Sequence, residues 1–182
     1  MTRPYRLFFV LPFVLMAQSP LQDPLYKRLQ RLYFLSAQNA TYLKAFEDTL
    51  QILIQRYGPY PSLQMYRYGG LALKARYSSN LLEKKDYLYT AMASMDAQVA
   101  RTPQDIEVRF IRGSFYYYLP FFLGKRKAAQ DDIHTLAHLL EAQSQELIRL
   151  YDREVLRAMV EFLAQTGWVE EERVRRLRRL YS

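Results

Sequence analysis

The chain has 182 residues, half of them hydrophobic, with no cysteine and 16 tyrosines. This length and composition suffice for one folded domain with a core and exclude an intrinsically disordered chain. The lack of cysteine excludes disulfides, thiol catalysis and cysteine-ligated zinc. The net charge of +8 is compatible with an anionic partner but does not require one.

The N-terminal segment is typical of a secretory signal. Two arginines precede the apolar run LFFVLPFVLMA (residues 7–17), which is too short to span a bilayer comfortably. We expect a signal peptide over residues 1–17, cleaved after Ala17, and therefore an exported protein, periplasmic or extracellular. Leu15 stands where a small residue is preferred, so an uncleaved anchor is the alternative.

Helical spacing of apolar residues continues from Pro24 nearly to the C-terminus. It predicts terminal helices within 24–57 and 145–181, including one long helix over 145–165 and a short one in EEERVRRLRRLY. Between them we expect helical hairpins over about 60–103 and 104–142. The motif RYGPYPS ends the first group of helices, because glycine stops a helix and proline cannot continue it. The sequence thus predicts one all-α domain, residues 18–182, of about 7–8 helices.

The aromatic stretch RFIRGSFYYYLPFFLG lies within one of these helices, which Pro120 ends. Its wheel has two apolar rows and a single polar row formed by Asp105, Arg109, Arg112 and Tyr116, so most of the aromatic rings are expected in packing. Glycines within two helices, at 69–70 and 113, cost about 1 kcal/mol each against alanine. We therefore expect a neighbouring helix to approach closely at these glycines.

Residues 63–142 contain a repeat. Gly70 and Gly113 are 43 residues apart, and each lies in the first helix of a two-helix unit. Such a period is typical of stacked helical hairpins, that is, a short α-solenoid. YRYGGLALKARY, followed by PQDIEVRFIRGSFYYYLPFFLG, resembles the motifs of small exported bacterial tetratricopeptide-like (TPR-like) proteins over roughly residues 60–142. The resemblance implies the fold and export, and it transfers no catalytic residue.

The polar row suggests an interaction site. In stacked hairpins the first helix of each unit lines the concave surface, where partners bind. A basic, Tyr-edged groove is therefore expected for a protein or peptide partner, possibly acidic, and its residues are Arg67, Lys74, Arg109, Arg112 and Tyr116. The alternative is that the arginines pair with acids of the chain itself, such as Glu83, Asp86 or Asp105.

Two other features suggest different functions. The last helix carries five arginines, Arg173, Arg175, Arg176, Arg178 and Arg179. These arginines could bind an anionic membrane, or the helix could instead cap the open end of the solenoid. His134 and His138 share a helix face and could contribute to a zinc site, but Thr135 stands where metalloproteases carry their glutamate.

The sequence contains no nucleophile elbow, phosphate loop or paired-acid signature. We therefore expect no enzymatic activity, no cofactor and, in an exported protein, no nucleic-acid partner. The leading hypothesis is an exported interaction or scaffold protein. Membrane-surface binding is the alternative, and the oligomeric state stays open.

Overall fold

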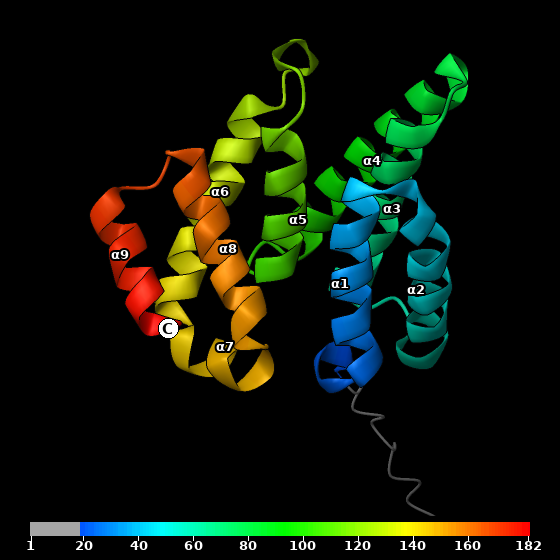
Figure 1. Cartoon of the computed structure of the whole chain (residues 1–182). Helices are drawn as coiled ribbons and strands as arrows, with labels where there is room; N and C mark the ends of the chain where they lie inside the picture. Colours follow the sequence, from blue (N-terminus) through cyan, green and yellow to red (C-terminus); the bar gives the residue numbers. More distant parts are fainter. Residues whose placement is uncertain (1–18) are drawn as a thin grey trace, which may run out of the picture.

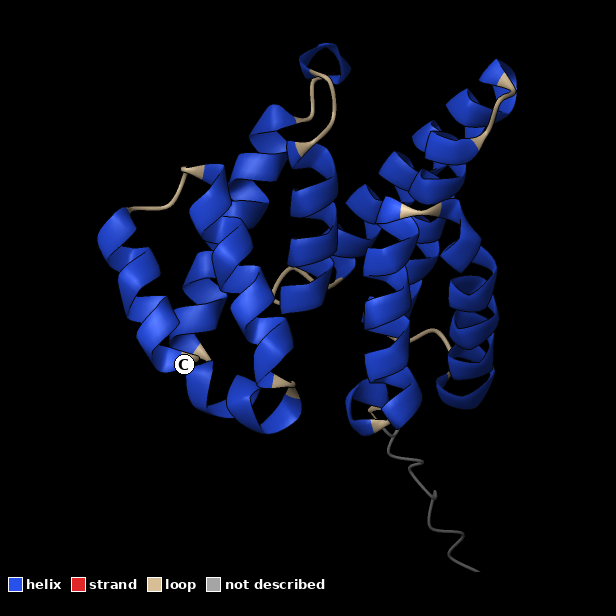
Figure 2. Ribbon diagram, viewed as in Figure 1, coloured by secondary structure: helices blue, strands red, loops and turns tan. Residues whose placement is uncertain are grey.

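The computed structural model describes residues 19–182, so the predicted signal peptide lies outside the described residues. Within this range the chain is helical throughout, without a β-strand (Figure 2). Its α-helices are α1 (Pro24–Gln38), α2 (Leu43–Tyr57), α3 (Pro61–Tyr77), α4 (Leu81–Arg101), α5 (Ile106–Tyr117), α6 (Arg126–Ala142), α7 (Ser144–Leu150), α8 (Arg153–Thr166) and α9 (Glu171–Leu180). Three short 3-10 helices accompany them: η1 (Pro20–Gln22), η2 (Ala40–Tyr42) and η3 (Phe121–Leu123).

Neighbouring helices pack in pairs. The most extensive packing joins α3 to α4 and α5 to α6, which are the two units predicted from the repeat, and α1 packs on α2. Figure 1 shows α1–α4 on one side of the molecule and α6–α9 on the other, with α5 between them. The all-α class and the helix pairs are confirmed. A solenoid of the TPR type stays a prediction.

The helix boundaries follow capping chemistry. The Asp23 carboxylate accepts the Leu25 N–H at 2.9 Å at the start of α1, and the Asn80 side chain accepts the Leu82 N–H at 2.9 Å at the start of α4. Gly58 follows α2 with a φ of 71°, which favours glycine, so the motif RYGPYPS ends a helix as predicted.

The glycines inside helices mark close helix contacts, as predicted. A Cβ atom on Gly70 would lie 3.0 Å from the Phe46 ring of α2, and one on Gly113 would lie 3.0 Å from the Asp132 Cβ of α6. At these distances the neighbouring side chain must move. The absence of a side chain therefore lets α3 approach α2, and α5 approach α6.

The prediction of one helix over 145–165 is wrong, because the chain breaks between α7 and α8 at Tyr151 and Asp152. The Asp152 carboxylate accepts the Glu154 N–H at 3.0 Å and forms an ion pair with Lys27 of α1. This aspartate therefore caps a new helix and ties it to the N-terminal helix. The split is one reason why the described residues contain nine α-helices rather than seven or eight.

Two main hydrophobic clusters form the core, one around α1–α5 and one around α5–α9, and Phe110 of α5 packs against both. In α4, Ala91, Met95 and Val99 are buried, but Tyr87 is only half-buried. No residue from 81 to 90 is buried, so the first half of α4 projects beyond the core.

Candidate functional site

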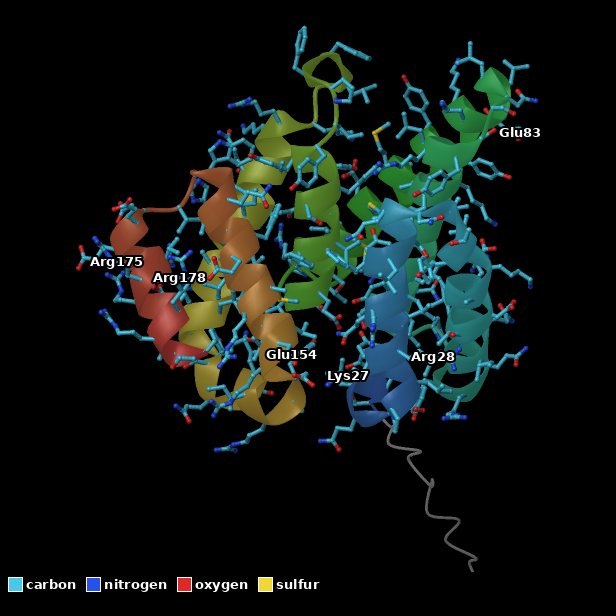
Figure 3. All side chains as sticks on the ribbon, in the orientation of Figure 1. Lys27, Arg28, Glu83, Glu154, Arg175 and Arg178 are labelled. Carbon is cyan, nitrogen blue, oxygen red and sulfur yellow. The ribbon has the colours of Figure 1, made fainter. Side chains whose placement is uncertain are left out.

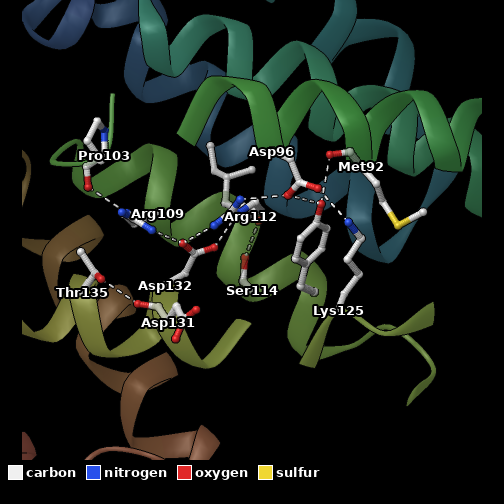
Figure 4. A network of polar contacts seen from close by, with 12 residues as sticks. Met92, Asp96, Pro103, Arg109, Arg112, Ser114, Lys125, Asp131, Asp132 and Thr135 are labelled. Atoms are coloured by element: carbon white, nitrogen blue, oxygen red, sulfur yellow. Dashed lines mark hydrogen bonds and ion pairs between the residues drawn. The ribbon is translucent and has the colours of Figure 1, made fainter. Parts of the chain in front are cut away.

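The polar row predicted on α5 lies at the junction of α4, α5 and α6 (Figure 4). Arg112 is 8% exposed and donates two hydrogen bonds to Asp132 of α6, from Nε at 2.7 Å and from Nη2 at 2.8 Å. Its Nη1 donates to Asp96 of α4 at 2.9 Å. This guanidinium therefore links three helices at once.

Asp132 is fully buried and accepts from a second guanidinium as well. Arg109 Nη1 donates to Asp132 Oδ1 at 2.6 Å, and Arg109 Nε donates to the Pro103 carbonyl at 2.8 Å. Because a buried charge needs charged partners and full hydrogen bonding, the two arginines compensate this carboxylate.

Tyr116 and Lys125 complete the network around Asp96. The Tyr116 hydroxyl lies 2.9 Å from Asp96 Oδ1 and 3.0 Å from the Met92 carbonyl oxygen, and its side chain is 2% exposed. Lys125 Nζ forms an ion pair with Asp96 Oδ2 at 2.7 Å. Burial raises the pKa of Asp96, but hydrogen bonds from Lys125 and Tyr116 and the charges of Lys125 and Arg112 outweigh it, so this pKa lies below its usual value.

The structure thus brings Arg109, Arg112 and Tyr116 together, but inside the helix packing rather than on an open groove. Their partners are Asp96 and Asp132, not the acids considered from the sequence. Both acids are at least sixteen residues from Arg112 along the chain, and no helix wheel of α5 alone could identify them.

The α3 part of the expected groove lies apart from this network. Lys74 pairs with Glu47 of α2 at 2.5 Å, and Arg67 is exposed on α3. No hydrogen bond or ion pair of the described residues joins either side chain to Arg109, Arg112 or Tyr116. The five predicted groove residues therefore do not form one continuous basic surface.

Next to the network, an open hollow of about 310 Å³ lies between α4 and the η3 turn. It is lined by Tyr89, Met92, Ala93, Asp96, Phe122, Leu123 and Lys125. Its two charged groups, Asp96 and Lys125, are already paired with each other. The rest of its lining is largely apolar, which suits contact with an apolar partner group rather than with a small charged ligand.

Exposed apolar side chains stand at the ends of the two helix pairs to which the walls of this hollow belong. Leu81 and Leu82 at the start of α4 are 76% and 73% exposed, and Phe121 and Phe122 in η3 are 86% and 73% exposed. We call these two doublets the hairpin tips, because each stands where a helix pair turns. Figure 1 shows both tips at the same end of the molecule, opposite the end where the described chain begins.

A buried carboxyl group, Glu107 of α5, is a feature that the sequence analysis missed. It is fully buried and accepts hydrogen bonds from Tyr26, from Gln30 at 2.9 Å and from Tyr66 at 2.7 Å. Burial raises its pKa, against the effect of these donors. The large number of tyrosines in the sequence was the one signal that could have indicated such a group, because a buried tyrosine hydroxyl needs a hydrogen-bond acceptor.

The C-terminal arginines mostly face acids of neighbouring helices. Arg173 donates to Glu141 of α6 at 3.0 Å, and Arg178 makes two hydrogen bonds, at 2.8 and 2.6 Å, to Glu161 of α8. Figure 3 shows Arg175 and Arg178 on α9 at the outer side of the molecule. Val174 and Leu177 are buried in the core, so α9 packs as an end helix.

The remaining arginines of α9 have weaker contacts. Arg175 and Arg176 lie 3.9 and 3.6 Å from the acids one turn before them, and no ion pair within residues 19–182 involves Arg179. Membrane binding through α9 stays a prediction.

His134 and His138 are both exposed on α6. Over residues 19–182 no group of three or more histidine, cysteine or acidic side chains is placed to hold a metal ion. In the same range, no helix is both long and apolar enough to cross a membrane.

Comparisons with known proteins add nothing to this geometry: no family model, no curated protein and no solved structure matches the chain. The resemblance to TPR-like exported proteins therefore stays a prediction, and function must be argued from the structure.

Proposed function

We propose that this chain is a non-enzymatic interaction protein that contacts its partner through the two hairpin tips. The observation that supports the proposal is the exposure of Leu81, Leu82, Phe121 and Phe122, each at least 73%. Large apolar side chains that gather at one end of a soluble domain are typical of an interaction surface.

The way in which the two tips are attached to the rest of the fold supports the same function. The first half of α4 projects beyond the core, while Lys125, two residues after η3, is held to Asp96 of α4 by its ion pair. The ion pair thus fixes the η3 turn relative to α4, which carries the other tip. In contrast, the polar side chains at the junction of α4, α5 and α6 form hydrogen bonds and ion pairs with one another, so few of them are available to a partner.

Site-specific photo-cross-linking in cells that make the protein tests this proposal. A photoreactive phenylalanine analogue is placed at position 122 or 81, and for comparison at Phe34, which is 65% exposed on α1. We expect a cross-linked protein or lipid at positions 122 and 81 and little product at 34. If both tip positions give no more product than position 34, in chains with unchanged helicity, the proposal is wrong.

A further inference from the structure

The chemistry of the hairpin tips identifies a class of partner. We propose that the tips dock on an anionic lipid bilayer, and that the side chains of Leu81, Leu82, Phe121 and Phe122 enter its surface. This inference rests on the proposed function. No part of the chain described here has to cross the bilayer for such docking.

The shape of the tips favours a bilayer over a folded partner. Both tips lie at the same end of the molecule (Figure 1), and the Phe121 and Phe122 rings are largely exposed and lie edge to face, with centroids 6.1 Å apart. Two separate protrusions can enter one deformable surface together. A rigid protein partner would instead need two cavities at the matching distance.

The charges beside the tips favour an anionic surface. Lys125, Arg126 and Lys127 follow η3 after Gly124, and the chain has no acidic residue from Val108 to Gln130. Lys125 pairs with Asp96 of α4, so Arg126 and Lys127 carry the positive excess. Lys84 and Lys85 follow the other tip, where Glu83 and Asp86 balance them; Figure 3 labels Glu83 there. The positive excess therefore lies at η3, and basic residues near an anionic bilayer each strengthen binding by about 1 kcal/mol.

Tyrosines stand just behind the apolar doublets. Tyr118 precedes η3 and Tyr89 lies two turns into α4, and both are more than half exposed. A tyrosine ring has an apolar body and a polar end, and it is enriched at the level of lipid headgroups. Apolar tips with tyrosines and lysines behind them match the polarity profile of a bilayer surface.

The hollow between α4 and η3 offers no competing recognition chemistry. Its charged groups, Asp96 and Lys125, pair at 2.7 Å. A specific protein or peptide site would present polar groups to orient its ligand. Here the apolar doublets are exposed to solvent, whereas Asp96 and Lys125 are paired with each other.

The test uses local fluorescence, because the apolar run at residues 7–17 could bring the chain to a vesicle by itself. The full chain has no cysteine, so Phe121→Cys, Leu81→Cys and the control Phe34→Cys each create a single labelling site for an environment-sensitive fluorophore. Each labelled chain is titrated with vesicles of phosphatidylcholine alone, and with vesicles containing phosphatidylglycerol as well.

We expect a blue shift of emission at positions 121 and 81 with phosphatidylglycerol vesicles, and none at position 34. In the chain labelled at position 81, Phe121→Ser should weaken vesicle binding about tenfold or more, since burying a phenylalanine stabilises by about 1.5–3 kcal/mol. Lys127→Gln should weaken it about fivefold. Added salt should weaken binding as well.

Three results would overturn the inference: no shift with phosphatidylglycerol, a shift at only one tip, or equal shifts on both kinds of vesicle. The cross-linking experiment then shows whether the proposed function survives. A protein cross-linked at position 122 would keep the tips as an interaction surface with a different partner, and no product at all would remove both proposals.

Discussion

Replacing Asp132 by asparagine should be one of the most destabilising single changes in the chain. The substitution keeps the shape of the side chain but removes its charge. Arg109 and Arg112 then lose the carboxylate that they share, at 2.6–2.8 Å. Arg112 cannot turn to solvent, because its side chain is only 10% exposed and lies between α4 and α6.

The size of the effect follows from this burial. Removing one partner of a buried ion pair costs about 3–5 kcal/mol, because the other charge stays buried and uncompensated. For a chain of this length, each kcal/mol lowers the melting temperature by about 2–4 °C, so Asp132→Asn should lower it by about 6–20 °C. Asp48→Asn is the matched control, since Asp48 pairs with Lys44 at 2.6 Å on the surface of α2, where water screens the pair and its loss should change stability little.

Urea unfolding followed by circular dichroism measures both variants. A common denaturant slope would show that the difference lies in stability rather than in the compactness of either state. Arg112→Met combined with Asp132→Leu should be less destabilising than the sum of the two single changes, because residues in one buried network do not act additively. If Asp132→Asn costs no more than Asp48→Asn, the buried network does not hold the helix junction and our reasoning is wrong.

Two further predictions concern α5 and α3. The pKa of Glu107 is raised above 4.5, the usual pKa of a glutamate. Above that pH the folded state still holds the proton on Glu107, whereas the unfolded chain has lost it. Stability should therefore fall as the pH rises from about 4.5 through the pKa of Glu107 in the folded state. Unfolding measured across that range should show a smaller fall for Glu107→Gln, and an equal fall would contradict the assignment. Gly70→Ala should lower the melting temperature despite the better helix propensity of alanine, because the new Cβ would meet the Phe46 ring at 3.0 Å. A higher melting temperature would show that the ring moves without cost.

The helices could be predicted because their signals are local. Apolar periodicity predicted a helical hairpin over about 60–103, which is where α3 and α4 lie, and the motif RYGPYPS predicted the break before α3. The break at Asp152 was missed, because a capping aspartate within a periodic apolar segment resembles an exposed polar residue of a continuous helix. The ion pair with Lys27, more than a hundred residues away, also depends on the tertiary fold, which the local pattern does not contain.

The candidate site was less predictable, because its residues are defined by partners on other helices. The wheel of α5 correctly grouped Arg109, Arg112 and Tyr116, but it could not show which side faces solvent. That depends on Asp132, which reaches the same point from α6 beside Gly113. Phe121 and Phe122 illustrate the reverse error: aromatic residues are usually buried, so most rings of this stretch were expected in packing, but these two are largely exposed.

The buried network and the exposed tips depend on each other. A protein that displays apolar side chains risks collapsing them onto its own surface, unless the segments that carry them are fixed. Arg112 joins α5 to α4 and α6, while Lys125 joins the end of the η3 turn to α4 through Asp96. If the tips bind as proposed, Arg109 and Arg112, which were expected to contact a partner, act on binding indirectly by fixing the helices that carry the two tips. On this argument, Asp132→Asn should weaken vesicle binding through lost tip geometry, even though Asp132 is fully buried and cannot touch lipid.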